Sequence, residues 1–358
     1  MKILAFETSC DDTSVSIVQG GRKVLSSCTA SQISEHTLYG GVVPEIASRR
    51  HCESIKKVCE ETFKKAYIDL KDIDAVAATY TPGLIGSLLV GLNFAKGICL
   101  SKNLPLVPVH HLRGHVASLY ISNEGLSPPF LCMIVSGGHT HIVDVRDYTE
   151  MAVIAKTRDD AAGETFDKIA KHLGLPYPGG IYIDKIASKG NPYAYKNIPR
   201  PEIENNKYDF SFSGIKTFVI NIINDAKNKG QKINTEDMAA SVRFAVIDYM
   251  VSKFIMAAKK LRYQKLAICG GVSANILFRD TMNKECEKLG FKFFMPKLEF
   301  CGDNAAMIGS QGYYEYIEGN TSSLDINAFA SKDIAITIEE HPVFHDSLPA
   351  ISWERPQK

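Results

Sequence analysis

The chain contains 358 residues, of which 45% are hydrophobic and 23% are charged, and its formal net charge is +1. The length is sufficient for two domains, and the composition is that of a globular protein, which excludes a disordered chain. The small net charge excludes a protein that binds polyanions through its overall charge. A local basic patch remains compatible with nucleic-acid binding. Nine cysteines, an odd number without a Cys-x-x-Cys pair, argue against a disulfide framework and favour a reducing, cytoplasmic location.

The first segment has the pattern of a β-hairpin with a polar tip. Residues 3–6 form a short apolar run, residues 14–18 alternate as a strand does, and Glu7-Thr-Ser-Cys-Asp-Asp-Thr13 joins them. The segment has no long apolar core and no cleavage site, so we expect neither a signal peptide nor a membrane span. The tip offers hydroxyl and N–H groups to a phosphate and Asp11 or Asp12 to a cation, while the simpler interpretation is a solvated loop.

A helix and a strand–turn–helix unit come next. Pro44 suits the first position of a helix that extends to residue 66, and its several basic residues favour a solvated face over a contact with phosphates. Residues 73–79 have the pattern of a strand, and Thr81-Pro-Gly-Leu-Ile-Gly-Ser87 leads into an apolar helix that ends near Leu100. This layout aims helix N–H groups at an anion, but it lacks the Gly-Lys-Ser/Thr of a Walker loop.

Two histidines follow the next predicted strand, residues 104–109. His111 and His115 are four residues apart, so on a helix their imidazoles project from one face, one turn apart. This spacing suits two nitrogen ligands of one metal ion, and a third ligand must come from elsewhere in the chain. The same spacing also occurs in helices that bind no metal.

The second half of the chain repeats the pattern of the first. After a polar connection at residues 121–129, an apolar strand at 130–135 leads to Ser136-Gly-Gly-His-Thr140 and a returning strand at 141–145. Much later, a strand at 265–269 enters Gly270-Gly-Val-Ser-Ala-Asn275 and a helix. We therefore predict a duplicated α/β architecture with a ligand cleft between the copies. The expected domains are residues 1–124, residues 125–340 and a loosely ordered tail at 341–358.

Two segments of this second half carry charged and aromatic residues. Asp160, Glu164 and Asp167 lie along one face of a helix predicted over residues 159–171, and a glycine turn at 177–184 enters another helix. Residues 207–216 alternate aromatic and hydroxyl side chains, which predicts an exposed edge or loop that enters a helix.

Asp303 stands at the start of the last predicted helix. It follows Gly302, and small residues after it allow tight packing, so this helix is expected to pack back on the first lobe. An aspartate here is usually the helix N-cap. Asp303 is also the best candidate for the missing oxygen ligand beside His111 and His115.

Taken together, the motifs resemble those of one family, the tRNA N6-adenosine threonylcarbamoyltransferases (TsaD/Gcp, formerly described as O-sialoglycoprotein endopeptidases). The resemblance covers residues 1 to about 315. It rests on Glu7-Thr-Ser-Cys-Asp11, Gly40-Gly-Val-Val-Pro-Glu45, Pro82-Gly83, His111-x-x-x-His115, Val135-Ser-Gly-Gly-His139, Asp209-Phe-Ser-Phe-Ser-Gly-Ile-Lys216, Gly270-Gly-Val-Ser-Ala-Asn275 and Cys301-Gly-Asp-Asn304, in this order.

The resemblance implies a two-lobed actin/sugar-kinase/Hsp70-like (ASKHA) fold with duplicated, ribonuclease-H-like mixed sheets and flanking helices. It implies transfer of threonylcarbamoyl from threonylcarbamoyl-AMP to N6 of adenosine 37 in tRNA. It also implies one divalent metal ion, with Fe²⁺ favoured and Zn²⁺ as the alternative, held by His111, His115 and Asp303. Two partners are implied, a TsaB-like paralogous subunit and a TsaE-like P-loop ATPase. The residues that match the adenylate site are Val135, Ser136, Gly137, Gly138, His139, Asp167, Gly180, Asp184 and Asn275.

The chain departs from the family pattern at three positions. Arg113 replaces Glu or Gln, Gly302 replaces Thr, and Ile181 replaces Pro. On a helix Arg113 points away from the two histidines, so we expect little effect there, whereas Ile181 affects the loop that carries Gly180. Asp11 is a candidate for orienting the incoming amine or a bound cation.

Three other function classes compete with this interpretation. A zincin metalloprotease needs His-Glu-x-x-His, and here residue 112 is Leu. A small-molecule kinase on the same fold would transfer phosphate from ATP to a hydroxyl, and this reaction does not require the histidine pair. A non-catalytic scaffold on this fold is expected to lack the histidines, which are present.

Overall fold

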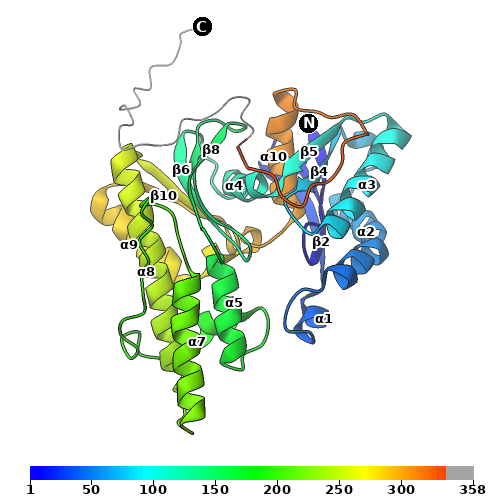
Figure 1. Ribbon diagram of the computed structural model, residues 1–358. Coiled ribbons are helices and arrows are strands. Elements are labelled where there is room, and N and C mark those ends of the chain that lie inside the picture. Colours follow the sequence, from blue (N-terminus) through cyan, green and yellow to red (C-terminus); the bar gives the residue numbers. More distant parts are fainter. Residues whose placement is uncertain (336–358) are drawn as a thin grey trace.

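The computed structural model describes residues 1–335 as two lobes, each built on a five-stranded mixed sheet (Figure 1). The first lobe and its connection to the second contain β1 (Lys2–Glu7), β2 (Asp12–Gln19), β3 (Lys23–Ser31), α1 (Ile33–Thr37), α2 (Pro44–Ala66), β4 (Ala75–Thr81), α3 (Ile85–Lys102), β5 (Leu106–His110) and α4 (His111–Ser122). The remaining elements are β6 (Phe130–Val135), β7 (Thr140–Val145), β8 (Met151–Lys156), α5 (Ala162–His172), α6 (Gly179–Ala187), α7 (Ser213–Asn228), α8 (Thr235–Leu261), β9 (Lys265–Cys269), α9 (Ile276–Leu289), β10 (Lys292–Phe294) and α10 (Ala305–Ile317).

The two sheets have the same topology. Their strand orders are β3-β2-β1-β4-β5 and β10-β9-β6-β7-β8. In each sheet three antiparallel strands come first in sequence, and two strands that run parallel to the first of them follow. The predicted duplication is therefore confirmed. The predicted hairpins lacked their third strands, β3 and β8, and the predicted repeat lacked the short edge strand β10.

The first sheet is covered on both faces. Apolar side chains of α2 and α3 pack on one face with Leu4, Phe6 and Val76. The other face is covered by α10, although α10 comes after the whole second lobe in sequence. A Cβ on Gly309 would lie 2.7 Å from Val18, and one on Gly312 would lie 2.6 Å from Ala77. These glycines therefore let α10 lie close to the sheet.

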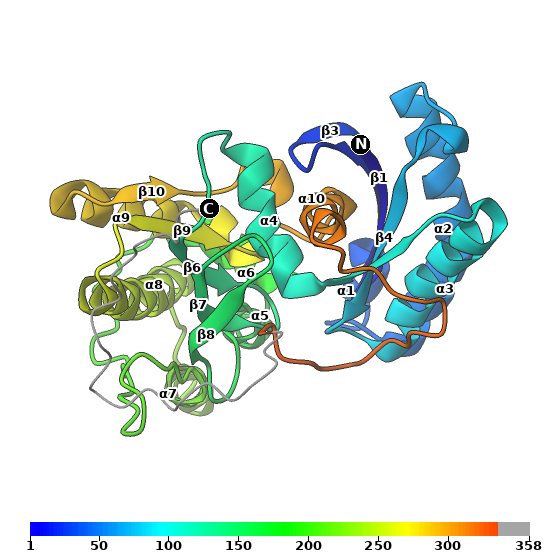
Figure 2. The same cartoon turned by 90° about the horizontal axis from the view of Figure 1, so that it is seen from above.

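Helix α4 lies between the lobes beside α10 (Figure 2). Its apolar residues, among them Val116 and Leu119, pack against Cys132 and Ile134 of the second sheet. At Gly114 a Cβ would lie 2.6 Å from Ile308 of α10. The two helices thus approach closely at the level of the histidine pair.

The segment at residues 207–216 differs from its prediction. Phe210 and Phe212 are fully buried, so the predicted exposure was wrong, whereas the loop that enters a helix is confirmed, because α7 begins at Ser213. Their burial is possible because the alternating hydroxyls of Ser211 and Ser213 both donate to Asp159, at 2.6 Å each. The buried Asp209 pairs with Arg158.

Other expectations concern the ends of the chain and the cysteines. All nine cysteines are free, as predicted. Within residues 1–335 no helix combines the length and apolar character that crossing a bilayer requires. The tail predicted at residues 341–358 lies outside the described residues.

Candidate metal centre and active site

The two predicted ligand histidines occupy the first turns of α4. The helix begins at His111, and the side chain of His110 caps it by accepting a hydrogen bond from the backbone N–H of Leu112 at 3.2 Å. His111 and His115 are buried, and their ring centroids are 4.7 Å apart. The prediction that both imidazoles share one helix face is confirmed.

Asp303 meets this pair from the other end of the sequence. Its Oδ1 lies 3.4 Å from Nε2 of His111 and 3.2 Å from Nε2 of His115. Asp303 is not the N-cap of α10, because Asn304 Oδ1 accepts from the Met307 N–H at 2.9 Å. The carboxylate of Asp303 is thereby left for the histidines.

The donor set fits a divalent cation. One ligand atom from each of the three residues lies within 4.8 Å of the others. Both ring nitrogens of His115 are buried, and neither makes a hydrogen bond of good geometry within residues 1–335, although Nε2 lies 3.2 Å from Asp303 Oδ1. Buried nitrogens without a partner are costly unless a ligand uses them. Two imidazoles and a carboxylate suit Fe²⁺ or Zn²⁺.

A buried glutamate, Glu7, orients the first histidine. His111 Nδ1–H donates to Glu7 Oε2 at 2.9 Å, which leaves Nε2 directed at Asp303. Glu7 also accepts from Thr79 and from the Ser9 N–H. Burial alone would lower the pKa of His111, but the charges of Glu7 and Asp303 outweigh it and raise this pKa well above its usual value. The site therefore has an excess of negative charge that favours a cation.

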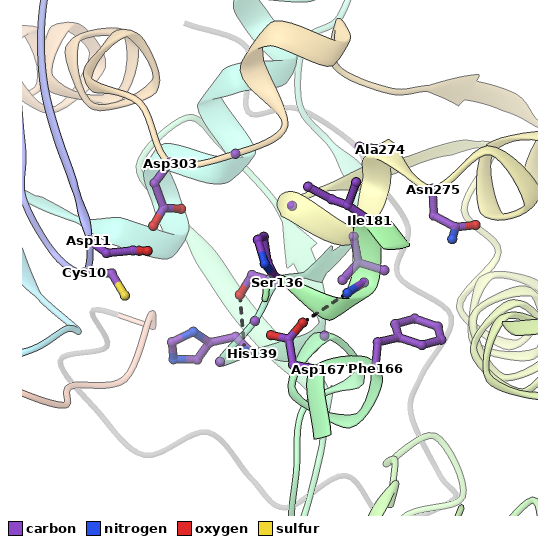
Figure 3. A pocket seen from close by; sticks show the side chains of 18 of the residues that line it. Cys10, Asp11, Ser136, His139, Phe166, Asp167, Ile181, Ala274, Asn275 and Asp303 are labelled. Carbon is purple, nitrogen blue, oxygen red and sulfur yellow. Dashed lines mark hydrogen bonds between the residues drawn. The ribbon is translucent and has the colours of Figure 1, made fainter. Parts of the chain in front are cut away.

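The histidine–aspartate cluster borders a large pocket between the lobes. The pocket has a volume of about 980 Å³ and receives residues from both lobes (Figure 3). Asp11 and Asp303 lie on one side, and Ser136, His139 and Asp167 lie on the other. The predicted site residues that line it are Asp11, His111, Ser136, Gly137, Gly138, His139, Asp167, Gly180, Asp184, Asn275 and Asp303.

Known proteins match most of the chain. A family model described as "TsaD: tRNA N6-adenosine threonylcarbamoyltransferase" matches residues 23–310. Proteins named tRNA N6-adenosine threonylcarbamoyltransferase from Clostridium botulinum (strain Kyoto / Type A2) and Clostridium kluyveri (strain NBRC 12016) are 50% and 48% identical to the chain, over 92% of it and 96% of their own lengths. The chain belongs to the TsaD family.

Solved structures support the fold alone, because their sequence identity is low. A structure of T. kodakarensis HypF, at 14% identity, has a TM-score of 0.60 over 89% of this chain and 48% of its own. Component A of the Acidaminococcus fermentans (R)-2-hydroxyglutaryl-CoA dehydratase, also at 14% identity, has a TM-score of 0.51 over 88% of this chain and 99% of its own. The predicted two-lobed ASKHA fold is confirmed.

The glycine loop of this TsaD-family chain connects β6 and β7. Gly137 and Gly138 are exposed to the pocket, and nothing lies within 4 Å of where their Cβ atoms would be. Gly163 lets the start of α5 touch the loop, because its Cβ would lie 2.5 Å from Ser136 O. Burial lowers the pKa of His139 to about 3, so this imidazole is neutral at pH 7. Val135 is fully buried in β6, and its side chain packs in the core instead of lining the pocket.

Asp167 anchors the second glycine turn. Its Oδ1 accepts from the Gly180 N–H at 3.1 Å. Gly179 is required here because a Cβ would lie 2.3 Å from Ala170. Burial raises the pKa of Asp167, and it outweighs the hydrogen bonds from the backbone N–H groups of Gly180 and Gly179, which lower this pKa. Ile181 is 66% exposed, and the Asp167–Gly180 contact is present beside it.

Asp184 and Asn275 form a bonded pair in the pocket wall. Asn275 Oδ1 caps α9 by accepting from the Phe278 N–H at 3.0 Å, while its Nδ2 donates to Asp184 Oδ1 at 2.9 Å. Asp184 also pairs with Arg243 at 2.6 Å. One N–H of the Asn275 carboxamide therefore remains for a ligand.

The two aspartates at the tip of the first hairpin differ. Asp11 lines the pocket, whereas Asp12 begins β2, and burial raises the pKa of Asp12 to about 7. Behind the tip, His51 Nε2 donates to Cys10 O at 2.9 Å and fixes the loop. The sequence predicted His51 to be one of the basic residues of a solvated helix face, which was wrong, because the side chain is fully buried.

Two glycine positions differ from their predictions. In the turn before α3, Gly83 N–H donates to Ala330 O and Leu84 N–H donates to Ser9 O, so these groups are not available to an anion. A Cβ on Gly83 would lie 2.6 Å from Ser9 O, which shows that the turn packs on the hairpin tip. Around Gly302 nothing lies within 4 Å of a Cβ, so tight packing does not explain that glycine.

Proposed function

We propose that the chain transfers the threonylcarbamoyl group from threonylcarbamoyl-AMP to N6 of adenosine 37 in tRNAs that read codons starting with A, which yields N6-threonylcarbamoyladenosine and AMP. The observation that carries the proposal is the placement of His111, His115 and Asp303 across one pocket from the glycine loop at residues 136–139. Membership of the TsaD family supports it.

In this proposal His111, His115 and Asp303 hold one divalent metal ion, with Fe²⁺ favoured and Zn²⁺ as the alternative. The contact of Asp303 Oδ1 with both imidazoles and the orienting bond from His111 to Glu7 support this assignment. When bound, the ion supplies Lewis-acid polarisation of the threonylcarbamoyl oxygens.

The opposite wall holds the adenylate. The exposed Gly137 and Gly138 allow the phosphate to approach the backbone at the start of α5, where the helix N-terminus favours negative charge. The Asp167–Gly180 contact and the free N–H of Asn275 fix the position of the nucleoside. Asp184 acts by holding Asn275 and the start of α9.

The donor is a mixed carbamic–phosphoric anhydride, so no protein nucleophile is needed. The lone pair of N6 attacks the carbamoyl carbon, the bond from that carbon to the phosphate oxygen breaks, and AMP leaves with the electron pair. The N6 proton passes to solvent or to the departing phosphate. Asp11, which lines the pocket, orients the incoming amine by accepting a hydrogen bond from its N–H. Catalysis then depends on positioning and charge stabilisation.

The proposed partners are a TsaB-like paralogous subunit and a TsaE-like P-loop ATPase, and the proposed location is the cytoplasm. The resemblance to bacterial members of the family supports both. No observation favours the metalloprotease, kinase or scaffold alternatives.

The test is mass spectrometry of tRNA nucleosides. Hypomodified tRNA is incubated with synthetic threonylcarbamoyl-AMP and the chain, with and without the two partners. We expect N6-threonylcarbamoyladenosine to form with wild-type protein and to be absent with His111→Ala or His115→Ala at unchanged fold. Peptide cleavage without nucleoside modification would instead support the protease.

A further inference from the structure

A segment that no motif singled out, residues 321–335, crosses from one lobe to the other and is called the strap here. It leaves the first lobe beside α3 and runs to the second lobe (Figure 2). Ser322 bridges to Leu106 at the edge of the first sheet, and Ala328 is buried in the first-lobe core. Its far anchor is Ile334, which is buried among Val143 and other apolar residues of the second sheet.

Between these anchors the strap forms part of the pocket wall. Ala330 and Ser331 both line the pocket. Phe329 N–H donates to Tyr80 O at 2.9 Å, and Gly83 N–H donates to Ala330 O at 3.1 Å. The side chains from 329 to 333 are exposed, and besides these backbone bonds the Phe329 ring meets Tyr80 edge to face, with ring centroids 6.4 Å apart.

Two strap carbonyls bind the helix that carries the histidine ligands. His110 Nε2–H donates to Lys332 O at 3.1 Å, and Arg113 Nε–H donates to Ile334 O at 3.0 Å. His110 and Arg113 are each only 1% exposed. They stand on either side of His111 in sequence, so the strap contacts α4 at its first turn.

Arg113 joins the strap to α10 as well. Its Nη1 pairs with Glu315 Oε1 at 3.0 Å and donates to Thr149 O at 2.7 Å. Glu315 belongs to the helix that begins just after Asp303. The strap, α4 and α10 therefore meet at one buried guanidinium, where α4 carries the two histidines and α10 follows the aspartate in sequence.

We propose that the strap positions α4 through His110 and Arg113 and so holds His111 and His115 in register with Asp303. His110 and Arg113 are positioning residues in this scheme, because they touch the strap and not the reacting groups. The inference rests on the proposed metal site. It adds a segment outside the matched range of residues 23–310 to the machinery of that site.

His110 allows a matched test, because its two ring nitrogens make different hydrogen bonds. Nδ1 accepts the capping bond from Leu112, and Nε2 bonds the strap. In His110→Asn, the amide oxygen can still accept the capping hydrogen bond from Leu112, but the side chain is too short to reach Lys332 O. In His110→Gln, the amide N–H can still donate to Lys332 O, but the capping hydrogen bond is lost. Each variant gives up one hydrogen bond, so a merely structural role predicts equal effects.

The first measurement is metal affinity of the full chain, by competition of Zn²⁺ or Fe²⁺ with a chelator. We expect His110→Asn to weaken metal binding about 10-fold, which is the lower limit of the effect usual for residues that support a metal ligand. The metal affinity of His110→Gln should stay near that of wild type. Equal affinity of His110→Asn and wild type, or equal loss in both variants, would overturn the proposal.

The second measurement needs no metal and separates this proposal from the proposed function. In metal-free protein, hydrogen exchange of amides in the second turn of α4 should be faster in His110→Asn than in His110→Gln. Equal exchange overturns the role of the strap even if wild type binds metal. Wild type that binds no metal counts against the proposed function, and the exchange data still decide the role of the strap.

A third pair of variants covers the case in which His110→Asn fails to fold. Ile334→Ala loosens the far anchor of the strap without altering α4, and Ile255→Ala makes the same truncation in α8. We expect weaker metal binding with Ile334→Ala alone. The same affinity in both variants would refute the proposal.

Discussion

Glu7 Oε2 and His111 Nδ1 lie 2.9 Å apart, although 104 residues separate them in sequence. Glu7 ends β1, and His111 follows β5 in the same sheet. The carboxylate therefore reaches the imidazole from the sheet edge on which the pocket opens. Its contact fixes the ring orientation and raises the basicity of the other nitrogen.

This relationship predicts the effect of Glu7→Gln. The amide oxygen still accepts the His111 N–H, but the negative charge is lost, so we expect metal affinity to fall by about 10- to 100-fold. Chelator competition measures this directly. Asp74→Asn, at an exposed carboxylate that binds the Lys2 N–H, is the control and should leave metal affinity unchanged. Equal affinity of Glu7→Gln and wild type would show that the glutamate only packs.

Metal removal gives the second prediction. Chelation should stop transfer, and Fe²⁺ or Zn²⁺ should restore it. Because a ligand that binds only the folded state stabilises it, metal at 100 times its Kd should add about 2.7 kcal/mol to the free energy of unfolding. Thermal unfolding with and without metal measures this. In His115→Ala the metal-dependent shift in Tm should be lost, and a shift that persists would place the metal elsewhere.

The histidine–aspartate site was predictable because each ligand stood in a recognisable local pattern, although neither pattern identifies a metal ligand by itself. The spacing of His111 and His115 is a helical turn, and Asp303 precedes a run of small residues. Glu7 was missed because a single acid at the end of an apolar strand does not reveal its partner. His51 was missed for the same reason, since only the folded chain brings it to Cys10 O.

The core strands were predictable from their apolar runs, and the edges were not. β3 alternates in burial, but its inward positions include Ser26 and most of its residues are small or polar, so its hydropathy shows no clear two-residue period; β10 has only three residues. The strap has almost no regular structure, and backbone carbonyls make its contacts with α4. Backbone contacts leave no trace in side-chain patterns.

A third prediction concerns Gly163, where α5 touches the glycine loop. A Cβ here would lie 2.5 Å from Ser136 O and 2.8 Å from Gly137 Cα. Because both are backbone atoms, Gly163→Ala should displace the loop, cost about 1–3 kcal/mol of stability and raise the KM for threonylcarbamoyl-AMP. Steady-state kinetics and urea denaturation measure these effects.

The matched control for Gly163→Ala is Gly97→Ala in α3. Nothing lies within 4 Å of its Cβ position, so the alanine should raise stability by about 1 kcal/mol through helix propensity and leave KM unchanged. If Gly163→Ala binds donor as wild type does, the loop at residues 136–139 is not the adenylate contact.

The last prediction concerns acid stability. Burial lowers the pKa values of His110 and His139 to about 3 and of His141 to about 4. Unfolded histidines bind protons near pH 6.5, so between that pH and about 4 the unfolded chain binds more protons and stability falls as pH falls. Each histidine contributes up to about 1.4 kcal/mol per pH unit. Urea denaturation at pH 7, 6 and 5 should show a smaller loss for His141→Gln than for wild type, whereas parallel curves would mean that His141 titrates alike in both states.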